Sequence, residues 1–258
     1  MMVIRVKFFL LCLLAGALTF GCATDEASRT STKKMAQAHE RLGTSFLSEG
    51  DYQAALRELL KAEELKPDSA EVQNSIGLSY MGLKEHNSAV LHFKKALQLK
   101  ADYPEAQNNL GTAYVYMQQW DAAIRYFEAA ANNLLYRTRH LAYANIGAVY
   151  HNKGEYRKAI DFYNKAIGYA AEYAPAYVNM GLAYEMLQEW DNAIEAYKKA
   201  AQIAPEDPFP PWQLGTLYLR LNRQEEGVEA LLAVIANDPN GPDGARARKI
   251  LDELRKQK

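Results

Sequence analysis

Cysteine is scarce in this chain, and blocks of like charge, long apolar runs and the short motifs of known active sites are missing. The 30 lysines and arginines nearly balance the 31 aspartates and glutamates, and they form no basic block or stripe that could neutralise phosphates. The 5 histidines lack the spacing of zinc ligands, and no phosphate loop or nucleophile elbow is present. We therefore expect no enzyme, metal, cofactor, small-molecule substrate or nucleic-acid partner.

The N-terminal 21 residues differ from the rest. Arg5 and Lys7 precede an apolar run of 11 residues, 8–18, which is shorter than the roughly 20 residues that span a bilayer. Polar and small residues follow directly. The sequence thus predicts a cleaved signal peptide over residues 1–21, and a retained N-terminal anchor is the less favoured alternative.

The stretch LTFGC, which ends at Cys22, resembles the lipobox of bacterial lipoproteins, although Thr19 replaces the usual leucine. The other cysteine, Cys12, would leave with the signal peptide, so no intramolecular disulfide could form. We predict that Cys22 is acylated and holds the protein on a membrane. Ala23 stands where aspartate would resemble an inner-membrane retention signal, which favours the periplasmic side of an outer membrane. Residues 22–35 have almost no apolar content and are predicted to form a lipidated N-terminus and flexible tether.

A recurring pattern organises the remaining chain. Six apolar–glycine pairs have glycines that are 34, 34, 36, 34 and 34 residues apart. An aromatic residue follows each glycine after three positions, a small residue after twelve and a large apolar residue after sixteen. The glycines are Gly43, Gly77, Gly111, Gly147, Gly181 and Gly215.

This spacing predicts two helices per unit, with the apolar residue, the glycine and the aromatic residue on one face of the first helix. Glycine costs about 1 kcal/mol of helix propensity relative to alanine, so its recurrence indicates a close approach of two helices. We expect the small residue of the second helix to permit that approach, and the large apolar residue to fill the gap between hairpins.

The period and its residues resemble the tetratricopeptide repeat (TPR). The resemblance implies an all-α fold, a right-handed superhelical solenoid of six TPR hairpins within residues 36–242. A capping helix over 243–258 is predicted from an apolar stripe that ends at Leu254. The expected repeats are 36–69, 70–103, 104–139, 140–173, 174–207 and 208–241.

The inner wall of a TPR superhelix is formed by first-helix residues that the repeat core does not use. Asparagine precedes the apolar–glycine pair in three consecutive repeats, where a carboxamide ladder could pair with the backbone of an extended partner. The alternative, that asparagine is simply common there, stays open. Apolar residues on the same wall suggest a groove that grips the side chains of a protein partner. The candidate groove residues are Leu78, Met81, Asn109, Thr112, Val115, Asn145, Asn179 and Leu182.

A lipobox, a short tether and six TPR units resemble the pilotins, the type IV pilus lipoproteins of the PilF, PilW or Tgl family. The irregular 36-residue step, with Leu135-Tyr136 and Arg139, is similar to that family's junction between the third and fourth repeats. The resemblance implies an outer-membrane protein that faces the periplasm, binds the pilus secretin and assists its localisation and multimerisation. It also adds Leu47 to Leu78 and Met81 as candidate contacts. Two alternatives remain, a periplasmic adaptor for cell-wall enzymes, proteases or barrel-assembly components, and an enzyme regulator.

Overall fold

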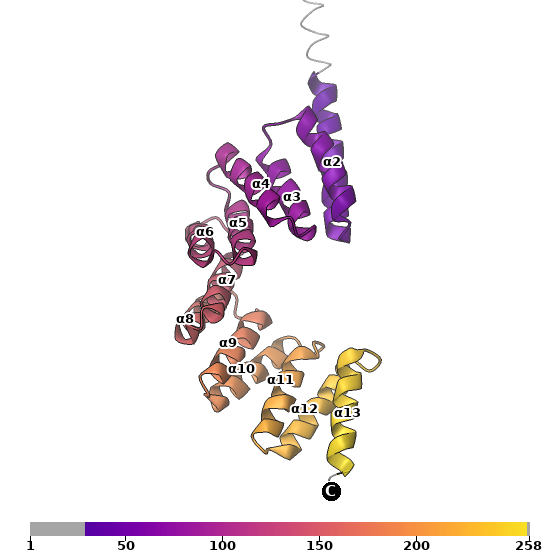
Figure 1. The fold of residues 1–258 in the computed structure, drawn as a ribbon, viewed down its shortest axis with the longest axis vertical. Coiled ribbons are helices and arrows are strands. Elements are labelled where there is room, and N and C mark those ends of the chain that lie inside the picture. Colours follow the sequence, from indigo (N-terminus) through magenta and orange to yellow (C-terminus); the bar gives the residue numbers. More distant parts are fainter. Residues whose placement is uncertain (1–28, 257–258) are drawn as a thin grey trace, which may run out of the picture. The chain divides into compact units, whose positions relative to one another are not determined.

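The computed structural model describes residues 29–256, and all regular secondary structure in this range is helical (Figure 1). An N-terminal helix spans residues 29–49. The helices after it are α2 (Tyr52–Leu65), α3 (Ala70–Gly82), α4 (His86–Leu99), α5 (Pro104–Tyr116), α6 (Trp120–Asn132), α7 (Arg139–Asn152), α8 (Tyr156–Tyr169), α9 (Ala174–Met186), α10 (Trp190–Ile203), α11 (Phe209–Arg220), α12 (Gln224–Asn237) and α13 (Pro242–Lys256). The predicted all-α fold of consecutive hairpins followed by a terminal helix is confirmed. None of the described helices is long and apolar enough to cross a membrane.

The N-terminal helix begins earlier than the sequence predicts. Residues 29–35, expected to belong to the flexible tether, are helical. No glycine or proline lies between Arg29 and Leu42, so a helix that is nucleated in the first repeat can propagate toward the N-terminus at little cost. The tether prediction is therefore wrong for residues 29–35. Its remainder, the signal peptide and Cys22 lie outside the described residues.

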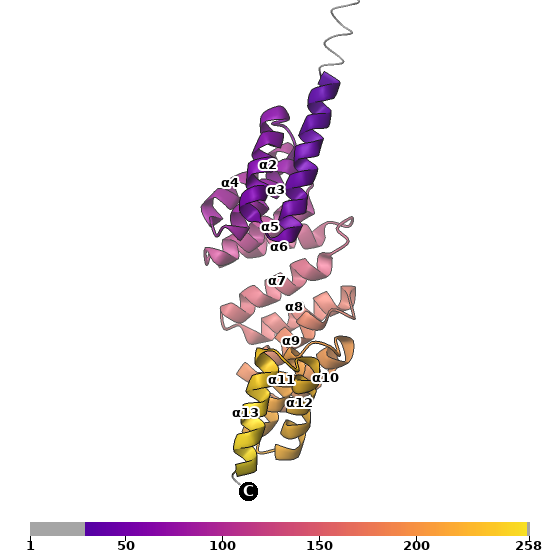
Figure 2. The same cartoon turned by 90° about the vertical axis from the view of Figure 1, so that its right-hand side faces the viewer.

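The chain divides into two compact units, Met1–Met117 and Gln118–Lys258. Unit 1 contains the N-terminal helix and α2 to α5, and unit 2 contains α6 to α13. The two helices of the third repeat, α5 and α6, thus fall in different units, and each is described within its own. In unit 2, α13 lies beside α12 at the C-terminal end (Figures 1 and 2).

The recurring glycines lie directly beneath large side chains of the second helix in the same hairpin. A Cβ atom on Gly77 would lie 2.5 Å from the ring of Phe93, and one on Gly181 would lie 2.5 Å from the ring of Tyr197. Such distances are too short for real contacts, so only glycine permits this approach. Gly43, Gly147 and Gly215 meet Leu59, Tyr163 and Leu231 in the same way.

This packing confirms the close approach of the two helices and adds a second contact for the large apolar residue. The sequence predicts that this residue fills the space between hairpins. Leu59 does contact the next hairpin, because it shares a buried cluster with Val72 and Ile76. It also covers Gly43 of its own hairpin, so one side chain joins three helices.

Alanine at Gly181 should therefore destabilise unit 2. We expect Gly181→Ala to lower the free energy of unfolding by about 1–3 kcal/mol, because the added methyl would displace the buried Tyr197 ring. Gly168 is a matched control on α8, since a Cβ atom there would have no neighbouring atom within 4 Å. Gly168→Ala should raise the free energy of unfolding by about 0.5–1 kcal/mol. Urea titration measures both, and equal effects would contradict the packing described.

Each first helix is followed, after one or two positions, by a residue in the left-handed backbone region. In five of the six repeats the next residue donates its N–H to the carbonyl of the recurring aromatic residue, as from Glu189 to Tyr184 at 2.9 Å and from Glu155 to Tyr150 at 2.9 Å. This hydrogen bond is typical of a Schellman motif. The left-handed residues are Gly50 (φ 79°), Lys84 (63°), Gln118 (58°), Gly154 (77°), Gln188 (60°) and Asn222 (59°).

Glycine at Gln188 should stabilise the turn, because a Cβ atom is unfavourable at positive φ. We expect Gln188→Gly to raise the free energy of unfolding by about 0.5–1 kcal/mol. Gly154→Ala, at the equivalent turn, should lower it by a similar amount, although no atom within 4 Å would clash with the methyl. Thermal and urea unfolding of the two variants test the pair, and a stabilised Gly154→Ala protein would refute the argument.

The terminal helix covers the last hairpin. Ala247 and Leu251 of α13 are buried against Leu231 and Val234 of α12. The Asp238 carboxylate accepts hydrogen bonds from the backbone N–H groups at the start of α13, at 2.9 and 3.3 Å. An acidic side chain at this end is favourable because helix N-termini carry a partial positive charge. The predicted capping helix is confirmed.

Candidate functional site, a groove in unit 1

A groove of about 450 Å³ opens on unit 1. Its walls come mainly from the first helices of three successive repeats, namely the N-terminal helix, α3 and α5. It is lined by Leu47, Tyr52, Leu78, Met81, Gly82, Phe93, Asn109, Thr112 and Tyr116. Five of the nine predicted groove residues are therefore brought together, namely Leu47, Leu78, Met81, Asn109 and Thr112.

The recurring glycine explains why these residues face the groove. Gly77 turns toward Phe93, so Leu78 and Met81, one and four positions later, lie on another side of α3. Thr112 occupies the position on α5 that Leu78 occupies on α3, one residue after the glycine. The packing of the glycine thus turns the residues that follow it on α3 and α5 toward the groove.

Two tyrosines also line the groove. Tyr52 lies against Gly82, where a Cβ atom would be 2.2 Å from its ring, so glycine makes room for an aromatic side chain from the neighbouring repeat. Tyr116 is exposed and stacks on His86, with ring centroids 4.9 Å apart and planes inclined by 11°. Both rings can present an apolar face and a hydroxyl group to a partner.

The polar groups of the groove are partly engaged already. Asn109 donates from Nδ2 to Oδ1 of the buried Asn74, at 3.0 Å. The Thr112 hydroxyl donates to the carbonyl of Asn108 at 3.1 Å. The carboxamide of Asn109 therefore holds α5 to α3, and its oxygen is the acceptor that a partner's N–H could reach.

The other predicted groove residues lie elsewhere. Val115 is half-buried on α5 and does not line the groove. Asn145 and Asn179 are half-buried on α7 and α9 of unit 2, so the ladder that would join them to Asn109 stays a prediction. Leu182 packs against the core cluster of α9, α10 and α11, which means that part of its apolar surface serves the fold.

Sequence reasoning misses four lining residues, Tyr52, Gly82, Phe93 and Tyr116. The repeat pattern assigns Phe93 to the core, and it assigns Tyr52 to the turn within the hairpin. Gly82 carries a signal of its own, because it is a helical glycine outside the recurring register. Its role requires the position of Tyr52, which only the packed repeats supply.

A polar network joins three of the helices that form the groove. The fully buried Gln73 of α3 donates from Nε2 to Glu63 of α2 at 2.7 Å, and its Oε1 lies 2.8 Å from Nδ1 of His92 on α4. Lys95 donates to the same Glu63 oxygen at 2.6 Å. Because every member has a partner, the network fixes the relative positions of α2, α3 and α4.

Burial shifts the titration of this network. Burial lowers the pKa of His92 below its ordinary value, against the opposing attraction of Glu63. Burial raises the pKa of Glu63, but hydrogen bonds from Lys95 and Gln73 outweigh it, and the net pKa is lowered. The network therefore combines a neutral imidazole with a charged carboxylate near neutral pH.

Acidification should weaken the fold through His92. A lowered pKa in the folded state means that protonation favours the unfolded chain, so this contribution is present above pH 6.5 and is lost as the pH falls below it. We expect the free energy of unfolding to decrease between about pH 7.5 and 5.5. The variant His92→Gln keeps an N–H donor but cannot titrate, and should reduce that decrease. His140 and His151, whose pKa values burial also lowers, supply the remainder. If His92→Gln showed the same pH dependence of unfolding as the parent, His92 would not be the source of the decrease.

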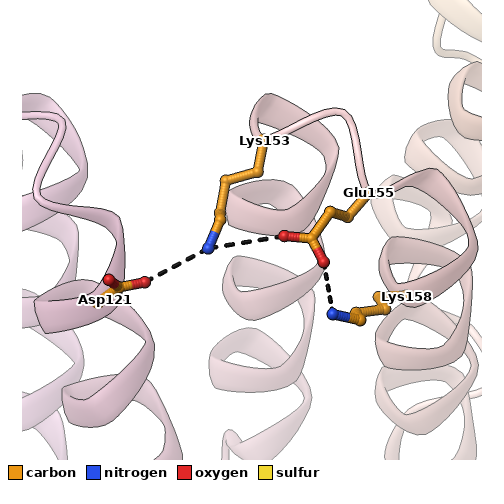
Figure 3. A network of polar contacts seen from close by, with 4 residues as sticks. All are labelled: Asp121, Lys153, Glu155 and Lys158. Carbon is orange, nitrogen blue, oxygen red and sulfur yellow. Dashed lines mark hydrogen bonds and ion pairs between the residues drawn. The ribbon is translucent and has the colours of Figure 1, made fainter.

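An exposed network of charges joins helices of unit 2 (Figure 3). Nζ of Lys153 lies 3.3 Å from Asp121 and 3.6 Å from Glu155, and Glu155 also accepts a hydrogen bond from Lys158. The hydrogen bond from Lys158 is the main cause of the lowered pKa of Glu155. Exposed ion pairs of this kind contribute little to stability. Within residues 29–256 no three His, Cys, Asp or Glu side chains gather as a metal site.

Comparisons with known families agree with this geometry. Tetratricopeptide-repeat family models match residues 43–84 and 78–118, 102–172 and 174–207. The chain is a tetratricopeptide-repeat protein. No curated protein sequence matches it.

Solved structures of other TPR proteins have similar folds. PilF of Pseudomonas aeruginosa is 18% identical with a TM-score of 0.70, over 86% of this chain and 99% of PilF. PilW, described as a widely conserved type IV pilus biogenesis factor, is 18% identical with a TM-score of 0.73, over 84% of this chain and 98% of PilW. MamA is 31% identical with a TM-score of 0.55, over 64% of this chain and 95% of MamA. The similarity to PilF and PilW is one of fold.

Proposed function

We propose that this TPR protein is a scaffold whose unit 1 groove binds an extended or helical segment of a protein partner. The observation that carries the proposal is the convergence of Leu47, Leu78 and Met81 on one groove with Asn109. The groove has a volume of about 450 Å³. Its apolar walls would hold side chains of the segment, while the Asn109 oxygen would accept a backbone N–H.

The partner that we favour is the type IV pilus secretin. The lipobox-like LTFGC supports a lipid anchor at Cys22 on the periplasmic face of the outer membrane. The fold shared with PilF and PilW over most of this chain supports the same role, that of a pilotin. A periplasmic adaptor for cell-wall enzymes, proteases or barrel-assembly components would use the same groove and remains the second candidate.

Met81 offers the cleanest test of the groove. Asn109 is less suitable, because its replacement would leave the buried Asn74 unpaired and cost about 1–3 kcal/mol of stability. Met81→Glu places a charge on the apolar wall, so we expect at least about a tenfold loss of affinity for the secretin. Leu91→Ser is the matched control, since Leu91 is an exposed apolar residue that does not line the groove.

The cellular test compares a gene deletion, Met81→Glu and Leu91→Ser. Outer membranes are blotted for heat-stable secretin multimers, and circular dichroism verifies that each variant is folded. We expect multimers to be lost in the deletion and in Met81→Glu, and to be kept in Leu91→Ser. Normal multimers in the deletion would remove the pilotin proposal. Multimers lost in the deletion but kept in Met81→Glu would remove the groove as the site.

A further inference from the structure

Two neighbouring leucines protrude from the loop that connects α6 and α7 in unit 2. Leu134 is 83% exposed and Leu135 is 84% exposed, whereas the next large apolar residue in the described part, Leu91, is 66% exposed. The loop, residues 133–138, belongs to the single 36-residue step of the repeat. The two leucines are thus presented where the other repeats have a shorter connection.

The loop is held in this conformation by its own contacts. The N–H of Leu135 donates to Oδ1 of Asn133 at 2.8 Å, and Nε of Arg139 donates to the Asn133 carbonyl at 2.8 Å. The next residue, Tyr136, is buried in a cluster with Ala130, Ala131 and Ala142. Because Tyr136 takes the buried position, both leucines remain outside the core. Their exposure is a property of an ordered loop.

Charge also distinguishes this loop. Every other loop between repeats contains a carboxylate, whereas residues 133–138 contain none. The loops with carboxylates are 66–69 with Asp68, 100–103 with Asp102, 170–173 with Glu172, 204–208 with Glu206 and Asp207, and 238–241 with Asp238. No Asp or Glu occurs from residue 129 to residue 154, and the exposed Arg137 lies within the loop.

An exposed aromatic residue, Tyr169, lies next to Arg139 at the end of this loop. The guanidinium of Arg139 lies 5.3 Å from the ring of Tyr169 and donates to its hydroxyl at 3.3 Å. Tyr169 is itself more than half exposed, at the end of α8. Arg139 thus connects the loop, through the Asn133 carbonyl, to Tyr169 at the end of α8. Tyrosine is enriched where proteins meet the headgroup region of a bilayer.

We propose that the loop formed by residues 133–138 is a membrane-contact element that binds an anionic phospholipid surface. Leu134 and Leu135 enter the boundary between headgroups and acyl chains, and Arg137 contacts lipid phosphate. The boundary between headgroups and acyl chains can bury a protruding apolar pair without a preformed pocket. The absence of carboxylates removes the repulsion that an anionic surface would exert on the other loops. The proposal depends neither on acylation of Cys22 nor on the partner of the groove.

Vesicle binding tests the proposal directly. The protein used is the chain from Ala23 onward, which retains every described helix and lacks the predicted acylation site. Its partition onto vesicles of phosphatidylethanolamine and phosphatidylglycerol is measured by sedimentation. We expect the double variant Leu134→Ser, Leu135→Ser to lower the partition coefficient by about tenfold or more, because the two leucines that would enter the membrane are lost. Arg137→Ala should lower it by about fivefold.

The matched control removes two exposed apolar residues elsewhere. Leu91 and Met186 are 66% and 57% exposed and lie on α4 and α9, so the double variant Leu91→Ser, Met186→Ser should bind vesicles like the parent. Equal losses in both double variants would overturn the proposal, since they would indicate non-specific adsorption. All four leucine and methionine positions are exposed, so the variants should stay folded.

A second measurement reports insertion itself. The chain from Ala23 onward contains no cysteine, because Cys12 and Cys22 both precede it. Leu134→Cys can then carry a single environment-sensitive fluorophore, whose emission should shift to the blue when vesicles are added. The same label at Leu91→Cys should not shift. No shift at residue 134, or secretin multimers lost in the leucine double variant with vesicle binding intact, would assign the loop to a protein contact and reject the membrane proposal.

Discussion

The contact between a helical glycine and the large side chain above it is the constraint on which the hairpins depend. Gly77 beneath Phe93 and Gly181 beneath Tyr197 show the same geometry in the two units. A glycine weakens an isolated helix, yet here it allows an aromatic ring to fill the space between two backbones. The packing energy of the buried ring offsets the lost propensity, which explains why the residue pair recurs in phase.

The groove follows from this contact. Once the glycine face of a first helix is committed to its own hairpin, the residues one and four positions later lie on another face, as Leu78 and Met81 do. The Gln73 network then fixes α2, α3 and α4 beside one another. A binding surface built on packed helices in this way is already formed before a partner arrives, which reduces the entropy lost on binding.

The connection between α6 and α7 shows how a small departure from the repeat can add a property. Two extra residues lengthen this step, and Tyr136 occupies the buried position that anchors the longer loop. Because Tyr136 is the buried residue of the loop, Leu134 and Leu135 remain exposed to solvent. The groove on unit 1 and the apolar loop on unit 2 thus use different residues, so a scaffold of this kind could bind a protein and a membrane through separate surfaces.

By itself the sequence determined the all-α class, the six hairpins and the capping helix, because glycine spacing and apolar periodicity are local signals of helix packing. It also identified Leu78 and Met81, since the repeat register states which side chains the core does not use, whereas Leu47 came only from the resemblance to the pilotins. Only the tertiary structure decided that Tyr52 joins them through Gly82, and that Asn109 is paired with Asn74. These contacts join residues of different repeats, and their geometry depends on how neighbouring hairpins pack, which no local pattern encodes.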